Sequence, residues 1–552
     1  MSIPDRGLLQ WLKERSADRG LHFAGPGDSW DHWSYARLAD LTCRTAAALA
    51  AHGVRNGDTV VVVQRSSPGF VAGLFGTMAA GATACSIAPP FAFQRADAYE
   101  SHVTPLFETA GPALIISDED SLPQVSRVAE RLGLKPPVLF DQLVEDVAPL
   151  PGPLPPARFA LLQFTSGSSG NAKGVRVTHE ALRANVTAMR RWLRWTPDLP
   201  GITWLPVHHD MGLIGCLLNI VTTGCDGWMM QPEDFIRSPS RYLRCISDQR
   251  VGLAAMPNFG LAYLLRRIRP ADLEGLRFDS LRSVILGAER IDPQALTGVE
   301  DLLGPHGFDR RAFLPAYGGA EATLCVTGLP LDEDWTALAP SGSEETAAPI
   351  VGCGRPLEGV EVEVVDDDGA VVADGTVGEI VVRGASVATD YVGRASAASG
   401  TTLADGTLRT GDAGFLRDGQ LFVVGRLGDG LKVRGRMVFA ESLEALLHQK
   451  GIPERRVAVL LGVRDGVNTA AVVFEIPKPE WFEVAADVLR EWLVDTELLR
   501  VEVGRGGLAV TSSGKPRRRV MWQALTAGSL TGRVGALTEH AQPCAQPAEG
   551  TR

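Results

Sequence analysis

The sequence predicts an α/β fold in which parallel sheets are covered by helices on both faces. Short apolar runs at 58–64, 83–88 and 113–118 alternate with helical patterns such as the one at 38–53. Strands separated by helices favour parallel pairing, because each connection must cross a face of the sheet. With 552 residues, of which 45% are hydrophobic and 22% charged, the chain can also form a large core and more than one domain.

A change of pattern after residue 350 predicts a smaller, β-rich region. Short strand patterns at 360–369, 378–384 and 420–425 are separated by turns, which is typical of an antiparallel sheet or barrel. The polar stretch 330–349 before it is expected to be a surface loop. We therefore expect an N-terminal core at 1–427 with two parallel-type subdomains and a β-barrel-like subdomain at 350–427, a small α/β domain at 428–535 whose mobility is implied only by the family resemblance described below, and a disordered tail at 536–552.

Charge and cysteine usage narrow the class of protein. The formal net charge of -11 argues against nonspecific binding to nucleic acid or to an anionic membrane, both of which favour basic surfaces. The eight cysteines show no CxxC spacing, so we expect free buried thiols in a reducing compartment. Because the first twenty residues also lack the pattern of a signal peptide, the sequence predicts a cytoplasmic protein.

One uncharged stretch, 66–94, is long enough to cross a bilayer. Glycine and alanine dominate it, and Gly81 is followed by a short strand pattern and a turn. We therefore expect a buried helix followed by a strand, and no membrane span.

The most informative segment is a loop after the predicted strand 160–164. Small residues let backbone amides approach a polyphosphate, hydroxyl groups add donors, and a lysine adds positive charge. The spacing fits neither the Walker pattern nor the GxGxxG fingerprint, so it indicates a different phosphate-binding loop. Its residues are Thr165, Ser166, Gly167, Ser168, Ser169, Gly170, Lys173 and Gly174.

Further motifs follow this loop in order along nearly the whole chain. They are WLPVHHDMGLIG (204–215), MPNFG (256–260), LGAE (286–289), LPAYGGAEATL (314–324), LRTGD (408–412), FVVGRLGD (422–429) and TSSGKPRRR (511–519). Together with the loop they resemble the adenylate-forming superfamily of acyl-CoA synthetases, luciferases and adenylation domains, and most of all the fatty acyl-AMP ligases. The resemblance implies ATP-dependent activation of a fatty or other bulky apolar carboxylic acid to acyl-AMP, with release of pyrophosphate.

This reaction joins two anions, so it depends on positioning and on neutralising charge. The resemblance implies that residues 165–173 hold the β- and γ-phosphates, and that Glu321, with Thr165, holds Mg²⁺ through ATP. It also implies that Tyr317 and Gly318 lie against adenine with Gly287 and Ala288, and that Asp412 accepts hydrogen bonds from both ribose hydroxyls. Arg426 is expected near the ribose and α-phosphate, and Lys515 at the carboxylate and the bridging oxygen.

The adjacent histidines His208 and His209 do not have the i, i+4 spacing of a helical metal site, and no cysteine or glutamate partner is evident. The resemblance instead implies that His209 lines the acyl pocket near the reacting carboxylate.

The hinge departs from the family pattern. Family members rotate the C-terminal domain about an Asp or Lys, but Gly428 stands at that position here. Glycine gives the joint a wide conformational range and leaves either closed state less preorganised. Transfer to a thiol is therefore less well supported than adenylation, and the acceptor stays open between CoA, a carrier-protein phosphopantetheine and a partner acyltransferase.

Three alternative functions remain. The first is a complete acyl-CoA synthetase, and the second is an inactive homologue that binds nucleotide, which the presence of Lys173, Glu321, Asp412, Arg426 and Lys515 disfavours. The third is amino-acid activation, for which Asp210 is the only obvious partner for an α-ammonium group.

Overall fold

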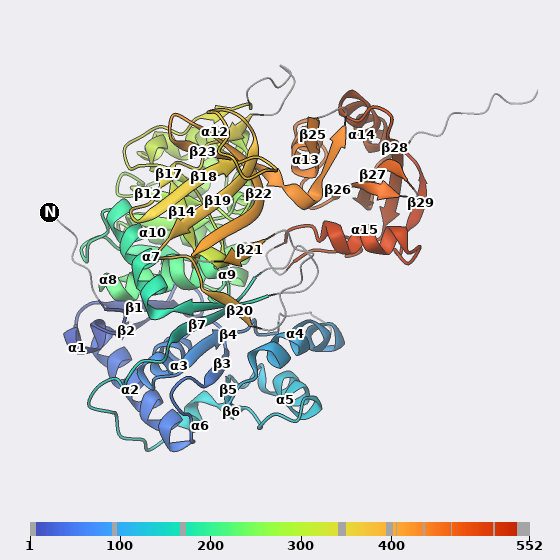
Figure 1. Cartoon of the computed structure of the whole chain (residues 1–552). Coiled ribbons are helices and arrows are strands. Elements are labelled where there is room, and N and C mark those ends of the chain that lie inside the picture. Colours follow the sequence, from blue (N-terminus) through green and yellow to red (C-terminus); the bar gives the residue numbers. More distant parts are fainter. Residues whose placement is uncertain are drawn as a thin grey trace, which may run out of the picture. The chain divides into compact units, whose positions relative to one another are not determined.

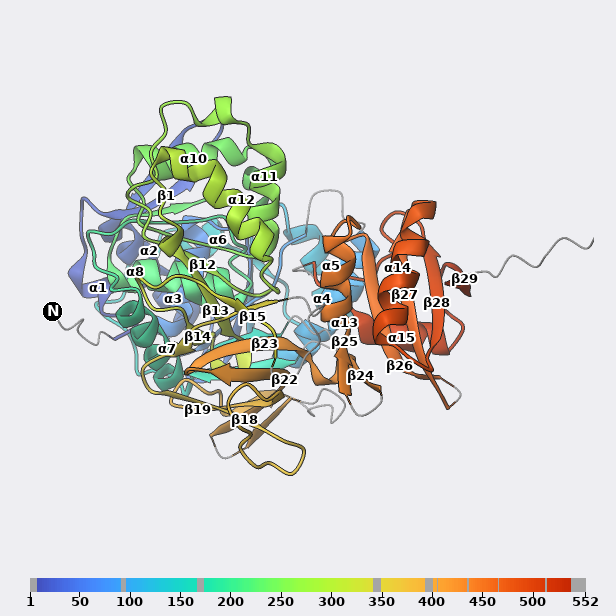
Figure 2. The same cartoon turned by 90° about the horizontal axis from the view of Figure 1, so that it is seen from above.

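The computed structural model describes residues 7–90, 96–165, 173–340, 349–392, 401–404, 406–433, 436–464, 466–511 and 514–537 (Figures 1 and 2). The described chain divides into two compact units. The first extends to Val423 and the second begins at Val424. The expected hinge at Gly428 lies four residues further on and stays a prediction.

The first unit contains a seven-stranded sheet, six of whose strands come from residues 59–178. Its central strands pair in parallel, whereas β8, near one end of the sheet, pairs antiparallel with both of its neighbours, β7 and β20. The order is β20 (Asp390–Val392), β8 (Gly174–Thr178), β7 (Phe159–Phe164), β4 (Thr83–Ser86), β3 (Thr59–Val63), β5 (Leu114–Ser117) and β6 (Val138–Leu139).

The two faces of this sheet pack against different helices because successive side chains of a strand point in opposite directions. Val60 and Val62 join the core with α2 (Tyr35–Ala51), α3 (Pro68–Ala79) and α6 (Phe140–Val144). Val61 and Val63 join the core with α4 (Ala96–Ala110) and α5 (Leu122–Arg131) (Figure 1).

A nine-stranded sheet follows the same plan. Its inner strands are parallel, with antiparallel strands at both edges. One face packs against α7 (His179–Trp192), the π-helix η1 (Met211–Leu218) and α8 (Asn219–Thr223), and the other against α10 (Pro239–Asp248), α11 (Asn258–Arg267) and α12 (Pro293–Leu303). The order is β17 (Arg355–Pro356), β14 (Cys325–Gly328), β13 (Phe313–Gly318), β12 (Ser283–Leu286), β11 (Leu253–Met256), β9 (Gly201–Thr203), β10 (Gly227–Met229), β1 (Gly20–Ala24) and β2 (Trp30–Ser34).

The first unit also contains a third, antiparallel sheet and several short helices and strands. In this sheet β23 pairs with β22, as Figure 2 shows. Its strands are β18 (Val360–Val365), β19 (Gly378–Gly384), β22 (Thr407–Arg417), β21 (Thr402–Ala404) and β23 (Gln420–Arg426). The remaining elements are α1 (Trp11–Glu14), α9 (Pro232–Arg237), β15 (Ala337–Leu338), β16 (Ile350–Val351) and the 3₁₀ turns η2 (Pro270–Leu273), η3 (Gly304–His306), η4 (Arg310–Ala312) and η5 (Ala320–Ala322).

The second unit has its own two-faced core around one sheet. Alternate residues of β26 point to α13 and α14 on one side and to α15 on the other. The elements are η7 (Leu427–Asp429), β24 (Gly430–Val433), β25 (Arg436–Phe439), α13 (Ala440–Gln449), β26 (Val457–Arg464), β27 (Val467–Glu475), α14 (Pro479–Trp492), β28 (Glu497–Val503), α15 (Arg518–Thr526) and β29 (Arg533–Ala536).

The α/β fold class predicted from the sequence is confirmed, including the β-rich region after residue 350. The uncharged stretch forms α3 and β4, and no helix in the described part of the chain is long and apolar enough to cross a membrane. Seven of the eight cysteines are described, and all seven are buried free thiols whose pKa values are raised by burial. The tail after 537 and the segment 341–348 of the polar stretch lie outside the described residues.

Candidate active site

The ends of the predicted phosphate loop form the base of a hairpin. β7 and β8 pair antiparallel up to Phe164 and Gly174. Beyond that pair the Thr165 amide donates to the Lys173 carbonyl at 3.0 Å, and the Lys173 amide donates to Thr165 Oγ1 at 3.2 Å. Both flanking residues are thereby fixed. Ser166, Gly167, Ser168, Ser169 and Gly170 lie outside the described residues.

Lys173 and Glu321 meet at the same tyrosine. The Lys173 ammonium lies 4.5 Å from the centre of the Tyr391 ring, and the Tyr391 hydroxyl donates to Glu321 Oε1 at 3.2 Å. Tyr391 reaches this position because β20 pairs with β8, which puts Tyr391 opposite Val175. All three side chains are partly exposed. A cation and a carboxylate are thus held side by side through a neutral aromatic residue, which is an arrangement able to hold phosphate and its counter-ion.

The turn that carries Glu321 is fixed by hydrogen bonds of the neighbouring residue Thr323. Thr323 is buried at φ +70°, and its carbonyl accepts from Gln163 Nε2 at 3.0 Å while its hydroxyl donates to the Ser386 carbonyl at 2.6 Å. A Cβ at Gly318 would lie 1.8 Å from the Leu324 carbonyl oxygen, so only glycine fits the closing of this turn. Glu321 therefore has a fixed backbone support.

Tyr317 and Asp412 form a second contact. The Tyr317 hydroxyl donates to Asp412 Oδ2 at 2.6 Å. Tyr317 is on β13, four residues before Glu321, and Asp412 is on β22. The two carboxylates predicted for ribose and for Mg²⁺ are therefore linked to neighbouring positions of one strand and turn.

A bulge in β22 presents Asp412. Residues 379 and 381 of β19 pair with 413 and 409 of β22, so β22 has additional residues in this interval. The Asp412 amide donates to Thr410 Oγ1 at 3.0 Å, whose hydroxyl donates to the Ile380 carbonyl, and Gly411 has φ +69°. Bulges redirect a side chain out of the regular alternation, which is what happens to Asp412.

Gly287 and Ala288 follow β12, the parallel neighbour of β13. A Cβ on Gly287 would lie 3.4 Å from the carbonyl oxygen of Ala316, so this backbone runs beside the residue preceding Tyr317. Ala288 has φ +66°, which is unusual for a residue with a side chain. The structure therefore brings Gly287, Ala288, Tyr317 and Gly318 together at the carboxyl-terminal ends of β12 and β13.

The histidine pair lies on the loop between β9 and η1. His209 Nδ1 is 2.7 Å from Asp210 Oδ1, and Asp210 also accepts from the Met211 amide. Burial, with smaller effects of His209 and His102, lowers the pKa of His208 to about 3. A Cβ on Gly212 would come within 2.3 Å of the Pro206 carbonyl oxygen, so the loop can fold this tightly only with glycine there. His208 is neutral at physiological pH.

Arg426 and Lys515 belong to the second unit. Arg426 ends β23 and precedes η7. Lys515 is on a turn in which its amide donates to Thr511 Oγ1 at 3.1 Å and the Thr511 amide donates to its carbonyl at 2.8 Å. Gly514 completes the turn at φ +90°.

Three residues after Lys515, a buried arginine anchors the start of α15. Arg518 donates to Asp429, Glu441 and Glu444 at 2.6–3.1 Å, and its side chain is 11% exposed. Burial raises the pKa of Glu441 to about 7, and Arg518 opposes that rise while Asp429 and Glu444 add to it. This Arg518 cluster connects the segment after Gly428 with α13 and with the turn of Lys515.

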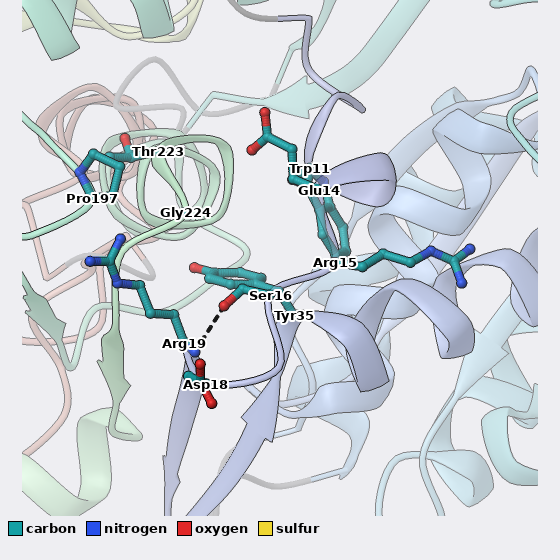
Figure 3. A pocket seen from close by; sticks show the side chains of 10 residues that line it. All are labelled: Trp11, Glu14, Arg15, Ser16, Asp18, Arg19, Tyr35, Pro197, Thr223 and Gly224. Carbon is teal, nitrogen blue, oxygen red and sulfur yellow. Dashed lines mark hydrogen bonds between the residues drawn. The ribbon is translucent and has the colours of Figure 1, made fainter.

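A pocket of about 370 Å³ lies elsewhere in the first unit, between α1, β1 and α8 (Figure 3). Its lining includes Glu14, Arg15, Asp18 and Arg19, and none of the residues predicted for adenylation. Its mixture of both charge signs does not select a nucleotide. The catalytic assignment therefore depends on the polar contacts described above.

Sequence reasoning missed Tyr391, Thr410 and Gln163. Tyr391 has no recognisable motif around it, and only the pairing of β20 with β8 brings it to Lys173. Thr410 did lie inside the quoted motif LRTGD, so its proximity to Asp412 was available as a signal.

Comparison with known proteins decides the family. A family model described as "AMP-binding enzyme" matches residues 10–392. The chain belongs to the AMP-binding enzyme family. A putative acyl-CoA synthetase of Caulobacter vibrioides is 30% identical, with 90% of each chain covered. A medium-chain-fatty-acid–[acyl-carrier-protein] ligase, JamA of Moorena producens, is 28% identical, with 95% of each covered.

A solved structure from a study of fatty acyl-adenylate ligases of E. coli and L. pneumophila matches with a TM-score of 0.85 and 26% identity, covering 95% of this chain and 98% of that one. This AMP-binding enzyme is therefore an adenylate-forming acid ligase that uses ATP and a carboxylic acid. The resemblance inferred from the motifs is confirmed.

Proposed function

We propose that this AMP-binding enzyme converts a fatty or other bulky apolar acid to its acyl-adenylate and passes the acyl group to a carrier-protein thiol in lipid or natural-product biosynthesis. The observation that carries this proposal is the pairing of Lys173 with Glu321 through Tyr391, four residues from the Tyr317–Asp412 contact. This arrangement would give phosphate and ribose separate positions on one unit.

In the proposed reaction an oxygen of the substrate carboxylate attacks the α-phosphorus of ATP. The new bond joins that oxygen to phosphorus, the bond from the α-phosphorus to the bridging oxygen breaks, and pyrophosphate leaves with the electron pair. Residues 165–173 would hold the β- and γ-phosphates through backbone amides, hydroxyl groups and the Lys173 ammonium. Asp412 would accept from the ribose hydroxyls, with Tyr317 fixing its orientation and Gly287, Ala288 and Gly318 bordering adenine.

The donor set also fits Mg²⁺ brought by ATP. Mg²⁺ prefers oxygen ligands and commonly binds one or two carboxylates together with substrate phosphates and water. Glu321 provides a carboxylate next to Lys173, and Thr165 provides a hydroxyl at the base of the same loop. Mg²⁺ held there would neutralise charge on the phosphates.

Two cations of the second unit would complete the site. We propose that rotation about Gly428 brings Arg426 to the ribose and α-phosphate, and Lys515 to the carboxylate and the bridging oxygen. Positive charge aimed at oxygens that gain charge in the transition state lowers the barrier to attack.

An apolar acid suits the surroundings of the histidine loop. The residues after Asp210 are almost all buried and apolar, and His208 is neutral. These apolar surroundings would tolerate a hydrocarbon chain, and His209 would donate to the carboxylate end. An α-ammonium group would need Asp210, but that carboxylate is already engaged by His209 and the Met211 amide.

For the acceptor we favour a carrier-protein phosphopantetheine, because the JamA relative is named as an acyl-carrier-protein ligase. Free CoA is the second candidate, supported by the relative named as an acyl-CoA synthetase. We further propose a cytoplasmic location, which suits the seven buried free thiols.

ATP–pyrophosphate exchange across aliphatic, aromatic, polycyclic and amino acids tests the adenylation step. We expect exchange only with apolar acids and only with Mg²⁺ present. Lys515→Ala should reduce the exchange rate by about 10²–10³-fold. Lys478→Ala, on an exposed lysine before α14, is the matched control.

Adding CoA or a holo carrier protein in a second series identifies the acceptor. Acyl-carrier product without acyl-CoA supports the proposal, and acyl-CoA product supports the alternative. If none of the acids supports ATP–pyrophosphate exchange, adenylation is contradicted and only a nucleotide-binding role is left.

A further inference from the structure

Three potential metal ligands gather at the edge of the nine-stranded sheet. His22 on β1 lies directly opposite His32 on β2 and also opposite Trp228 on β10. Asp226 precedes β10 by one residue. Directly paired residues project from the same face of a sheet with Cβ atoms about 5 Å apart, so the two imidazoles are neighbours.

The distances suit a single ion. One ligand atom from each of His22, His32 and Asp226 lies within 4.8 Å of the others, and no other such group of three or more His, Cys, Asp or Glu occurs in the described part of the chain. The imidazole ring of His22 is stacked between the imidazole of His32 and the indole of Trp228, with ring centres 4.5 Å apart in both pairs. Since the torsion that turns an imidazole is broad, His32 can rotate to direct a nitrogen toward an ion beside Asp226.

His32 has an unsatisfied donor or acceptor. Its Nε2 is buried and has no hydrogen-bond partner among the described residues. Metal coordination would satisfy this nitrogen.

Asp226 is held in place by two neighbours. Its Oδ1 accepts from the Gly20 amide at 3.0 Å and lies 3.4 Å from His22 Nε2. The side chains of His22 and Asp226 retain 21% and 28% exposure, so an ion from solvent can reach them.

We propose that His22, His32 and Asp226 form a binding site for a divalent transition-metal ion, with Zn²⁺ as the best fit. Two imidazoles and a carboxylate are a usual three-residue donor set for Zn²⁺, with water as the fourth ligand, whereas Mg²⁺ prefers oxygen ligands. The bound ion would connect β1, β2 and the start of β10. The site is separate from the residues proposed for ATP, and its function is to fix the edge of the sheet.

The test is metal binding to the full chain without an affinity tag. Co²⁺ and Zn²⁺ are added to wild type, to His32→Phe and to His52→Asn, and binding is followed by Co²⁺ absorption and by equilibrium dialysis with Zn²⁺. His32→Phe keeps an aromatic ring against His22 but removes both nitrogens. His52 is an exposed histidine at the end of α2 and serves as the control.

We expect one Zn²⁺ per wild-type chain, undiminished by excess Mg²⁺, and an affinity about 100-fold or more weaker in His32→Phe, since loss of even an outer partner costs 10–100-fold. Thermal unfolding should show a Zn²⁺-dependent rise in Tm in wild type and His52→Asn that is absent in His32→Phe. Circular dichroism without metal compares the folding of His32→Phe with that of wild type. If His32→Phe is misfolded, Asp226→Asn takes its place in the binding experiments. Equal Zn²⁺ binding by wild type and the folded variant would overturn the proposal. So would no binding by wild type at about 100 µM Zn²⁺, a concentration that saturates any site with a Kd of about 1 µM.

Discussion

The two units place their charged groups in opposite ways. In the first unit Lys173, Glu321 and Asp412 are partly exposed, and each contacts a tyrosine that carries no charge. In the second unit Arg518 is 11% exposed and is surrounded by three carboxylates. The first arrangement orients each charge against the ring or the hydroxyl group of a tyrosine. The second uses its charges on one another and holds a fold together.

The largest expected effect comes from breaking the buried arrangement. Arg518→Met removes the guanidinium and leaves three carboxylates close together in a buried place, which should cost the second unit about 3–5 kcal/mol of stability. Hydrogen exchange measured by mass spectrometry should show faster exchange in peptides of 424–537 and little change before 424.

Arg505→Met is the control, since Arg505 is exposed. If peptides of 424–537 are equally protected in Arg518→Met and in this control, the Arg518 cluster does not stabilise the second unit.

Asp412→Ala tests whether this partly exposed carboxylate serves a ligand. Loss of a charge-assisted hydrogen-bond acceptor is worth about 1.5–3 kcal/mol, so the KM for ATP should rise by about 10–100-fold with Tm nearly unchanged. Steady-state exchange kinetics measure this. A fall in Tm with an unchanged KM would assign Asp412 a structural role, and Asp367→Ala, on an exposed turn, provides the comparison.

A pH series sharpens the contrast from the side of the Arg518 cluster. Since the folded pKa of Glu441 is raised to about 7, the folded unit binds more protons than the unfolded chain between about pH 4.5 and 7, and its stability falls as pH rises through that window. Glu441→Gln should remove this dependence and be more stable than wild type at pH 8 by on the order of 2 kcal/mol.

Urea unfolding followed by exchange protection of the second unit, at pH 5 and at pH 8, measures the effect. Glu480→Gln, at an exposed position in the first turn of α14, should behave as wild type. A wild-type unit that gains stability from pH 5 to pH 8 would contradict the assignment to Glu441.

The smallest expected effect concerns the linking tyrosine. Tyr391→Phe keeps the ring next to Lys173 and removes only the hydrogen bond to Glu321, which should lower kcat/KM for ATP by about 5-fold, or 1 kcal/mol. Tyr263→Phe removes a phenol whose hydroxyl donates to the Ile236 carbonyl, and it serves as control. If Tyr391→Phe and Tyr263→Phe have the same kinetics, the hydroxyl does not position Glu321.

Local signals in the sequence were enough for the fold class. The alternation of Val-rich runs with helices predicted the parallel sheets, because both patterns are properties of short segments. Asp412 and Glu321 could also be picked out from the sequence, since each lies inside a contiguous motif. Tyr391 was not, because its place depends on the pairing of β20 with β8, a contact between distant segments. The bulge of β22 could not be predicted either, since it is defined only by the register against β19.

The Arg518 cluster shows the same limit. Lys515 is followed by a run of three arginines, each of which could be a solvated side chain. The sequence alone does not distinguish Arg518 from Arg517 or Arg519. Burial against α13 makes the difference, and burial is a property of the folded unit.

The late strand β20 also restricts how this protein can be recombined. Arg176 of β8 and Asp390 of β20, which pair across the sheet, are 214 residues apart along the chain. A chimera with a crossover between these two strands would inherit the β7–β8 hairpin from one parent and Tyr391 from the other. Exchange of acid specificity between relatives is therefore expected to succeed when everything up to Val423 is inherited as a single block, with the second unit as the exchangeable module.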